Sequence, residues 1–331
     1  MHHTASSLEG GRVMYMKKSM IIAAIVAVSM LFTAYCVGAA PKVSSDGLVT
    51  VEWLSKHMDD RGVVILDVRT FPKYMKNHIP GAIRAFGPWR LTNEKFVGFM
   101  APPVGELEEM LREFGVSNDS LVIIYDQGMT SSDTAKSARA LWTLHMLGHT
   151  NVAILDGGFN AWEQKELPLT ATPAIPVRGN FTAKPVAKKA ISLEEVQKKL
   201  GSKGTIFLDC RIPAEHFGHE KKSNIARFGH LPGSLLMPAS FLTIGGQNFS
   251  PAYLRKKDEL RQMASGVGLP NNSGAEIVVY SNTGEEAALC YFVLNNMLGY
   301  NNVRLFDGSV LEAAKAKDIA MVRYSWGWND R

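Results

Sequence analysis

One order of motifs occurs twice along this chain, and this internal repeat limits the possible folds more than any other feature. The paired motifs are Asp67 and Asp209, Arg69 and Arg211, the turns at His78 and His230, Tyr125 and Tyr280, Gly148 and Gly299, and the Asp-Gly pairs at 156–157 and 307–308. Their spacing varies from 142 residues (209 − 67) to 155 residues (280 − 125), so the loops differ in length. A chain of 331 residues is also longer than one core usually spans. The repeat therefore predicts two copies of one domain.

Within each half, patterns of buried strands alternate with patterns of helices. Short β-branched apolar runs predict strands at Val63–Val68, Leu121–Tyr125, Val152–Leu155, Thr205–Cys210, Ile277–Tyr280 and Val303–Phe306. Apolar residues at helical spacing predict helices at Val49–His57, Glu106–Phe114, Asp133–Leu147, Phe159–Gln164, Ser192–Leu200, Lys256–Gly266 and Ala287–Leu298. This alternation is typical of an α/β domain, in which helices cover both faces of a mainly parallel sheet.

A proline-rich stretch separates the two halves. Leu167–Pro185 contains several prolines and threonines and has no apolar periodicity, which is typical of a linker. We therefore expect a first domain at residues 46–168, a linker at 169–190 and a second domain at 191–320.

Residues 1–40 are expected to lie outside both domains. Two lysines, Lys17 and Lys18, precede the uncharged run Met20–Ala40, and small residues near its end suit cleavage of a secretory signal peptide. The run is also long enough to remain as a membrane anchor, which needs about 20 residues. Cys36 is a candidate for lipidation, as in bacterial lipoproteins. We expect a location in the bacterial cell envelope, periplasmic or membrane-anchored, with membrane contact only through this segment.

Charge and motif content exclude several classes of protein. The net charge is +5, but the basic residues are scattered, so no nucleic-acid partner is expected. The spacings typical of metal ligands and the glycine pattern of a dinucleotide site are missing from the sequence, so we expect neither a metal nor another cofactor. Cys210 and Cys290 could form one disulfide in an oxidising compartment, but buried free thiols are the favoured interpretation.

The stretch Glu276–Cys290 predicts the functional centre. Ile277–Tyr280 reads as a strand, Ser281–Glu286 as a short loop containing Gly284, and a helix follows. A strand that ends in such a loop before a helix N-terminus presents a cradle of backbone N–H groups, which suits an anion or a nucleophile. Ser281, at the end of the strand, occupies the position of the nucleophile.

The repeated motifs also resemble those of a known family. The segments L-D-V-R at 66–69 and H-I-P-G-A at 78–82, with second copies L-D-C-R at 208–211 and G-H-L-P-G-S at 229–234, are similar to the two signature segments of rhodanese-like domains. Together with Asp156–Trp162, they make essentially the whole chain after the N-terminal segment resemble the tandem-domain thiosulfate/3-mercaptopyruvate sulfurtransferases.

This resemblance implies a role for each half. The first domain of the family is usually catalytically silent, with Asp at the nucleophile position, and Asp126 fits that type. The second domain usually carries a cysteine that becomes a persulfide, and here the matching residue is Ser281. The resemblance also implies that Arg211 faces the substrate. The substrate-binding loop would then consist of Asn282, Thr283, Gly284, Glu285 and Glu286.

Ser281 lacks the chemistry that the family's reaction requires. A persulfide needs a sulfur atom and an attacking thiolate, and a serine hydroxyl needs an adjacent base even to act as a nucleophile. The histidines of the second half are expected to be exposed loop or turn residues; they are His216, His219 and His230. Glu285 and Glu286 suit a helix N-terminus, and their charge would repel an anion such as thiosulfate.

Two functions follow from these observations. The first is a non-catalytic module of the cell envelope that binds a small sulfur-containing or other small ligand, or an envelope protein, through the former active-site pocket. The alternative is an active thiosulfate/mercaptopyruvate-type sulfurtransferase with unusual chemistry, in which Cys210 replaces the missing cysteine. A serine hydrolase is not expected, because no G-x-S-x-G motif surrounds Ser281.

Overall fold

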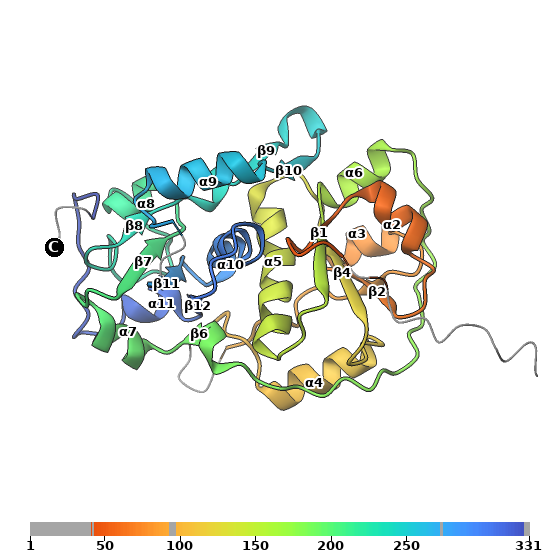
Figure 1. Ribbon diagram of the computed structural model, residues 1–331, viewed down its shortest axis with the longest axis horizontal. Helices are drawn as coiled ribbons and strands as arrows, with labels where there is room; N and C mark the ends of the chain where they lie inside the picture. Colours follow the sequence, from red (N-terminus) through yellow and green to blue (C-terminus); the bar gives the residue numbers. More distant parts are fainter. Residues whose placement is uncertain (1–40, 42, 93–96, 272–273, 328–331) are drawn as a thin grey trace, which may run out of the picture. The chain divides into compact units, whose positions relative to one another are not determined.

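The computed structural model describes residue 41 and residues 43–92, 97–271 and 274–327 (Figure 1). The predicted signal peptide or membrane anchor, with Cys36, lies outside the described residues. Within the described ranges, no helix is long and apolar enough to cross a membrane. All described residues belong to one compact unit of the chain.

Each half of the chain contains a five-stranded sheet, and the two sheets have the same strand order. The first has the order β1-β5-β4-β2-β3 and the second β6-β12-β11-β7-β8. Every pairing in both sheets is parallel. The strands are β1 (Leu48–Val49), β2 (Val63–Asp67), β3 (Ile83–Arg84), β4 (Leu121–Tyr125), β5 (Val152–Leu155), β6 (Ala190–Ile191), β7 (Thr205–Asp209), β8 (Leu235–Leu236), β11 (Glu276–Tyr280) and β12 (Val303–Phe306), with β9 (Thr243–Gly245) and β10 (Ala252–Leu254) forming a separate antiparallel hairpin.

Helices cover both faces of each sheet, as predicted. Neighbouring residues of one strand belong to different buried clusters, as Leu66 and Ile65 do in β2 and Val279 and Val278 do in β11. The helices are α2 (Val51–His57), α3 (Phe71–Lys76), α4 (Val104–Glu113), α5 (Ser131–Met146), α6 (Gly158–Gln164), α7 (Leu193–Lys199), α8 (Pro213–Phe217), α9 (Lys257–Gly266), α10 (Glu285–Phe292) and α11 (Ser309–Ala313). A π-helical turn, Val293–Met297, continues α10. The expectation of two α/β domains is therefore confirmed.

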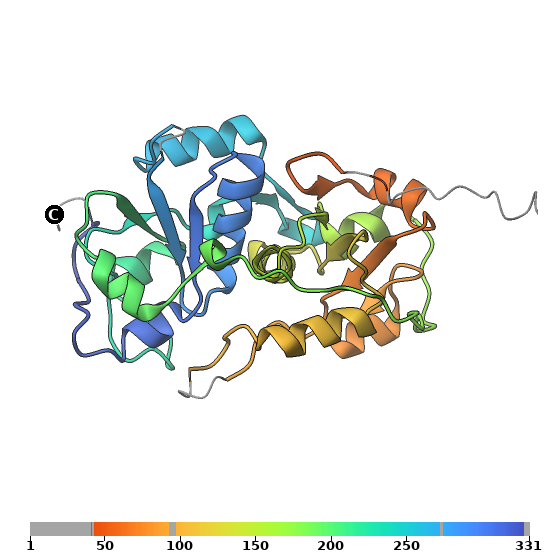
Figure 2. The same cartoon turned by 60° about the horizontal axis from the view of Figure 1, so that its bottom comes forward.

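The helices α5 and α10 lie side by side and join the cores of the two domains (Figures 1 and 2). One buried cluster contains Leu141 of α5 together with Leu289 and Phe292 of α10. The ring Nδ1 of His145 also lies 3.1 Å from the hydroxyl of Tyr291. The packing of these two helices is therefore part of the hydrophobic core, and it includes the polar contact between His145 and Tyr291.

The two domains also hold each other through the repeated Asp-Gly motifs. The backbone N–H of Leu254, in β10 of the second domain, donates to Oδ1 of Asp156 in the first at 2.9 Å. In the opposite direction, the N–H of Ala101 donates to Oδ2 of Asp307 at 2.7 Å. Each copy of the motif thus binds a segment of the other domain.

Three predicted helix starts shift for identifiable reasons. Val49 belongs to β1, and α2 begins after Thr50, whose hydroxyl accepts from the N–H of Trp53. Helix α5 begins two residues before Asp133, because Thr130 caps it by accepting from the Asp133 N–H. Helix α10 begins at Glu285, directly after Gly284. At the start of α7, Ser192 and Glu195 form a capping box, in agreement with the helix predicted to begin at Ser192.

Candidate functional site

The candidate loop connects β11, the central strand of its sheet, to α10. The strand ends at Tyr280, and Gly284 caps the helix with a φ angle of +77°. A Cβ atom at Gly284 would lie 2.8 Å from Nη1 of Arg139 and 3.0 Å from the carbonyl oxygen of Asp307. Both the backbone conformation and the close packing therefore require glycine at this position.

Ser281, the predicted nucleophile position, is completely buried. Its N–H donates to Oγ of Ser309 at 3.1 Å, and its carbonyl oxygen accepts from the N–H of Val310 at 3.0 Å. No hydrogen-bond partner for Ser281 Oγ is found among the described residues. A hydroxyl without a base in contact keeps its proton, so nothing in this arrangement activates the oxygen as a nucleophile.

Asn282 ties the loop to α8. Its Nδ2 donates to both carboxylate oxygens of Glu215, at 2.9 and 3.0 Å, while Oδ1 is buried with no partner in the part of the chain that the structure describes. Burial raises the pKa of Glu215, and the bond from Asn282 opposes that shift. Thr283, the next loop residue, is half-buried. The loop is thus held by a side chain from a different segment of the second domain.

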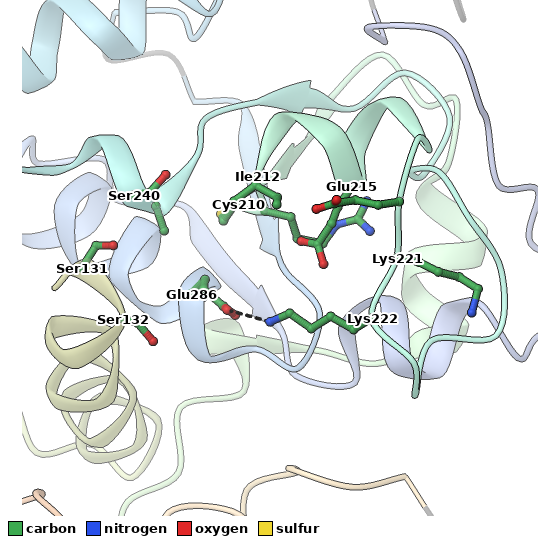
Figure 3. Close-up of a pocket in the computed structure, with 12 residues that line it drawn as sticks. Ser131, Ser132, Cys210, Ile212, Glu215, Lys221, Lys222, Ser240 and Glu286 are labelled. Atoms are coloured by element: carbon green, nitrogen blue, oxygen red, sulfur yellow. Dashed lines mark hydrogen bonds and ion pairs between the residues drawn. The ribbon is translucent and has the colours of Figure 1, made fainter.

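Glu285 and Glu286 begin α10, and each carboxylate has a basic neighbour. Glu285 forms an ion pair with Arg90 of the first domain. Burial raises the pKa of Glu285, and Arg90 opposes the shift. Oε1 of Glu286 lies 3.4 Å from Nζ of Lys222 (Figure 3). The negative charge expected to repel anions is therefore partly balanced by Arg90 and Lys222.

Arg211 lies against Asp209 at the end of β7. Its Nε is 2.9 Å from Oδ1 of Asp209, and its Nη2 is 2.6 Å from Oδ2 and donates to the carbonyl oxygen of Gly229 at 2.8 Å. Burial alone would raise the pKa of Asp209, but Arg211 and a hydrogen bond from His216 outweigh it and hold that pKa well below its usual range. The guanidinium is therefore committed to a buried ion pair.

The first domain repeats this ion pair. Arg69 contacts Asp67 in the same way, with Nε 3.1 Å from Oδ1 and Nη2 2.7 Å from Oδ2. Because the same ion pair occurs in both halves, it indicates a structural role, which is to fix the chain at the point where the strand ends. The substrate-facing role of Arg211 that the resemblance implies stays a prediction.

The prediction of exposed histidines was wrong for His216 and His230. Both are completely buried, and their rings stack with centroids 3.9 Å apart. His216 Nδ1 lies 3.0 Å from Oδ2 of Asp209, so the buried carboxylate accounts for its position. His219 is exposed. Neither buried ring forms a hydrogen bond with Ser281 Oγ.

A cavity of about 420 Å³, which we call the candidate pocket, lies beside the loop (Figure 3). It opens between the second domain and the first turn of α5. Its walls are formed by Ser131 and Ser132 of the first domain and by Cys210, Arg211, Ile212, Glu215, Glu220, Lys221, Lys222, Ala239, Ser240 and Glu286 of the second.

Of the predicted binding residues, Arg211 and Glu286 line the candidate pocket directly. Asn282 does not line the pocket, but it donates a hydrogen bond to Glu215, which does. Glu285 forms its ion pair with Arg90 instead. Cys210, the predicted surrogate nucleophile of the alternative function, also lines the pocket. Sequence reasoning missed the remaining lining side chains, because no motif marks Glu215, and Ser131 and Ser132 belong to the other domain. Among the described residues, no group of three or more His, Cys, Asp or Glu side chains is arranged to hold a metal ion.

The corresponding place in the first domain is covered. Asp126 follows β4, and its carboxylate accepts from the N–H of Gly128 at 2.6 Å and from the hydroxyl of Ser137 at 2.7 Å. Burial raises the pKa of Asp126 to about 7. The hairpin of the second domain packs onto this loop, where the N–H of Ala252 donates to the carbonyl oxygen of Gly128 at 2.7 Å.

Comparison with known families decides what kind of protein this is. A model of the rhodanese-like domain matches residues 50–165 and again residues 192–316. The chain belongs to the rhodanese-like family. In this tandem rhodanese-like protein, each matched segment contains four of the five strands of its sheet, and the edge strands β1 and β6 lie directly before the two segments.

This rhodanese-like protein is similar to sulfurtransferases along most of its length. It is 28% identical over 303 residues to the "Putative thiosulfate sulfurtransferase" of Synechococcus elongatus, which covers 89% of this chain and 90% of that protein. It is 29% identical to the thiosulfate sulfurtransferase of Corynebacterium glutamicum, covering 80% of this chain and 86% of that protein. Among solved structures, SseA of Escherichia coli, a 3-mercaptopyruvate sulfotransferase, has a TM-score of 0.68 at 28% identity and covers 80% of this chain and 98% of that one. The predicted family and fold are confirmed.

Proposed function

We propose that this rhodanese-like protein is an exported ligand-binding module that does not carry out persulfide chemistry. One observation carries the proposal: at the position where the resemblance places the family's cysteine, this chain has Ser281, whose buried hydroxyl has no partner among the described residues. An alcohol oxygen cannot hold a transferable sulfur as a thiolate does. Without a contacting base it is also not an activated nucleophile.

The candidate pocket supports the binding half of the proposal. Its volume of about 420 Å³ falls in the range of small-molecule sites, which are usually about 300–1,000 Å³. Lys222 and Glu286 offer charged groups of both signs at its wall, and Ser131 and Ser132 add hydroxyl groups. Thiosulfate and 3-mercaptopyruvate, which appear in the names of the relatives, are the first ligands to test. An envelope protein remains the second class of partner.

A cyanide-dependent thiocyanate assay tests the catalytic half of the proposal. The purified wild-type protein, Ser281→Ala and Ser281→Cys are compared with thiosulfate or 3-mercaptopyruvate as donor. We expect wild type to equal Ser281→Ala and Ser281→Cys to exceed both, because only the last carries sulfur at this position. Wild-type turnover above that of Ser281→Ala would contradict the proposal.

Calorimetric titration with the same two compounds tests the binding half. Ser132→Trp should block the candidate pocket from the first turn of α5 and weaken binding at least tenfold. The matched control is Ser265→Trp, an exposed serine on α9 that does not line the pocket. Equal affinity in both variants would show that the ligand binds elsewhere.

The alternative function uses Cys210 as a surrogate nucleophile, and its position in the pocket wall favours it. Burial, followed by the neighbouring Cys290 thiol, raises the pKa of Cys210 well above its ordinary value. The reactive thiolate is therefore scarce at neutral pH, which supports the non-catalytic proposal. A Cys210→Ser variant separates the two functions, because it should abolish turnover only if Cys210 carries the sulfur.

Export to the cell envelope is the remaining part of the proposal. Its support is the pattern of residues 1–40, a short basic start followed by an uncharged run. The mass of the protein recovered from a bacterial host distinguishes the outcomes. A chain shortened near residue 40 indicates a cleaved signal peptide, and a lipid-modified Cys36 at the new N-terminus indicates a lipoprotein. An intact chain in the membrane fraction indicates an anchor, and an intact chain in the cytoplasm would contradict export.

A further inference from the structure

Two cysteines from distant parts of the second domain meet in its core. Cys210 directly follows β7, and Cys290 lies within α10. Their exposed fractions are 1% and 0%, and both thiols are free. Each thiol donates to a backbone carbonyl oxygen, Cys210 to Leu208 at 3.6 Å and Cys290 to Met237 at 3.5 Å.

The segment around Met237 contacts both cysteines. The N–H of Met237 donates to the carbonyl oxygen of Asp209 at 2.9 Å, and the N–H of Ala239 donates to that of Cys210 at 3.0 Å. This segment therefore runs alongside the end of β7, and the thiol of Cys290 bonds to it. Both cysteines belong to the same buried cluster. Burial and then the neighbouring Cys290 thiol raise the pKa of Cys210, which agrees with this placement.

The two cysteines differ in their access to small molecules. Cys210 lines the candidate pocket, where its sulfur is seen beside Ile212 (Figure 3), whereas Cys290 does not line it. A reagent that enters the pocket therefore meets Cys210 first. Cys290 is placed behind it, as a resolving cysteine would be.

We propose that Cys210 and Cys290 form a reversible disulfide when a small disulfide oxidant enters the candidate pocket. The small fraction of Cys210 that is present as thiolate attacks one sulfur of the oxidant R–S–S–R in a slow step, which gives a mixed disulfide and releases one thiol. The thiolate of Cys290 then attacks the Cys210 sulfur, which closes the internal disulfide and releases the second thiol. The protein loses two hydrogen atoms, and the oxidant is reduced to two thiols.

This disulfide would act on the candidate pocket itself. It joins the end of β7, next to Arg211, to α10, whose first turn carries Glu286, and both of these residues line the pocket. A cross-link between two walls fixes the distance between them in the folded protein. It also lowers the conformational entropy of the unfolded chain, which stabilises the folded state. The inference does not depend on the proposed binding function, because it concerns only the two thiols and their access.

The test uses the reduced full chain and bis(2-hydroxyethyl) disulfide as the oxidant. After incubation the protein is acidified, unfolded, alkylated and digested, and the masses of the peptides are measured by mass spectrometry. We expect a cross-linked pair of peptides containing Cys210 and Cys290, lighter by two hydrogen atoms than the reduced pair and separated again by dithiothreitol. The melting temperature of the oxidised protein should rise by about 5 °C or more.

Single variants separate the two steps, and circular dichroism shows that each is folded. Cys290→Ser should accumulate a stable mixed disulfide on Cys210, because the resolving thiol is missing. Cys210→Ser should leave Cys290 unmodified, because Cys290 is completely buried. The inference is overturned if the wild-type protein keeps the mixed disulfide, pairs either cysteine with Cys36, or leaves both thiols free under conditions that oxidise the unfolded chain.

Discussion

Asp126 and Ser281 occupy equivalent places at the ends of the central strands β4 and β11, and their surroundings differ in one respect. Asp126 accepts hydrogen bonds from Gly128 and Ser137, whereas the Ser281 hydroxyl has no partner among the described residues. Burial raises the pKa of Asp126 to about 7, which makes its ionised form costly in the folded state. At the scale of the residue, the first domain therefore carries an acid that titrates near neutral pH.

This shift predicts a pH-dependent effect of Asp126→Asn. A carboxyl whose folded pKa is raised contributes stability that is fully present below its unfolded pKa of 3.8 and is lost as the pH rises through about 7. The variant, which cannot ionise, should gain melting temperature relative to wild type as the pH rises from about 4, and the gain should level off above about 7.

Thermal unfolding followed by circular dichroism from pH 4 to pH 8.5 measures this difference. Asp119→Asn, at an exposed position, is the matched control, because its side chain meets water in both the folded and the unfolded chain. A difference between Asp126→Asn and wild type that stays constant over this range would contradict the prediction.

The repeat in the sequence was sufficient to locate Asp126, Ser281, Asp209 and Arg211, but it did not predict the ion pair between Asp209 and Arg211. It was not sufficient to find Glu215 and Lys222, because their roles depend on contacts with residues at least 64 positions away in the chain. The error at His216 has the same origin. Its burial follows from a hydrogen bond to the Asp209 carboxylate, which no local pattern in the sequence reveals.

At the scale of the element, the long buried strands and most helices were predictable, whereas the short edge strands and the short helices α3, α8 and α11 were not. The strand β4 is a run of five apolar residues that are all buried, so composition alone identifies it. The strands β1, β3, β6 and β8 contain two residues each, too few to show any periodicity. The hairpin of β9 and β10 was also missed, and it is the element that covers the loop of the first domain.

The packing of that covered loop predicts a large effect of Gly128→Ala. Gly128 has a φ of +71°, and a Cβ atom there would lie 1.9 Å from the carbonyl oxygen of Gly157. Gly299 has a similar φ of +78°, but nothing lies within 4 Å of its Cβ position. Gly299→Ala should therefore cost only the backbone strain, about 1–2 kcal/mol. Gly128→Ala should cost more than about 4 kcal/mol, because backbone atoms must move.

Chemical denaturation of both glycine variants measures the two losses of unfolding free energy. Because the φ angles are nearly equal, the difference between the variants isolates the steric contact with Gly157. Equal losses would show that the loop at Gly128 and the turn at Gly157 separate at little cost.

At the scale of the whole molecule, buried polar contacts pass between the domains in both directions. Asp307 accepts from the N–H of Ala101 and forms an ion pair with Arg139, whose guanidinium lies over the ring of Trp142 at 4.7 Å. Arg139 also crowds Gly284, so α5 of the first domain supports the loop of the second. The sequence predicted two domains but not this support, because neither Arg139 nor Ala101 belongs to the repeated motifs.

This arrangement predicts that Asp307→Ala destabilises the whole molecule. The substitution leaves the buried guanidinium of Arg139 without its carboxylate, a change that typically costs about 3–5 kcal/mol. In differential scanning calorimetry the melting temperature should fall by about 5–10 °C. Asp318→Ala, at an exposed carboxylate, is the control and should change it by less than about 2 °C. A loss no larger than that of the control would show that the ion pair does not hold the domains together.

The central claim is that the wild-type protein keeps the rhodanese fold without forming a persulfide. Its most direct test is the intact mass of the protein after incubation with thiosulfate or 3-mercaptopyruvate and desalting without reductant, with a cysteine-containing sulfurtransferase treated in parallel. We predict that the sulfurtransferase gains one sulfur atom while the mass of the wild-type protein stays unchanged. A wild-type mass increased by one sulfur atom, on any side chain, would contradict the claim.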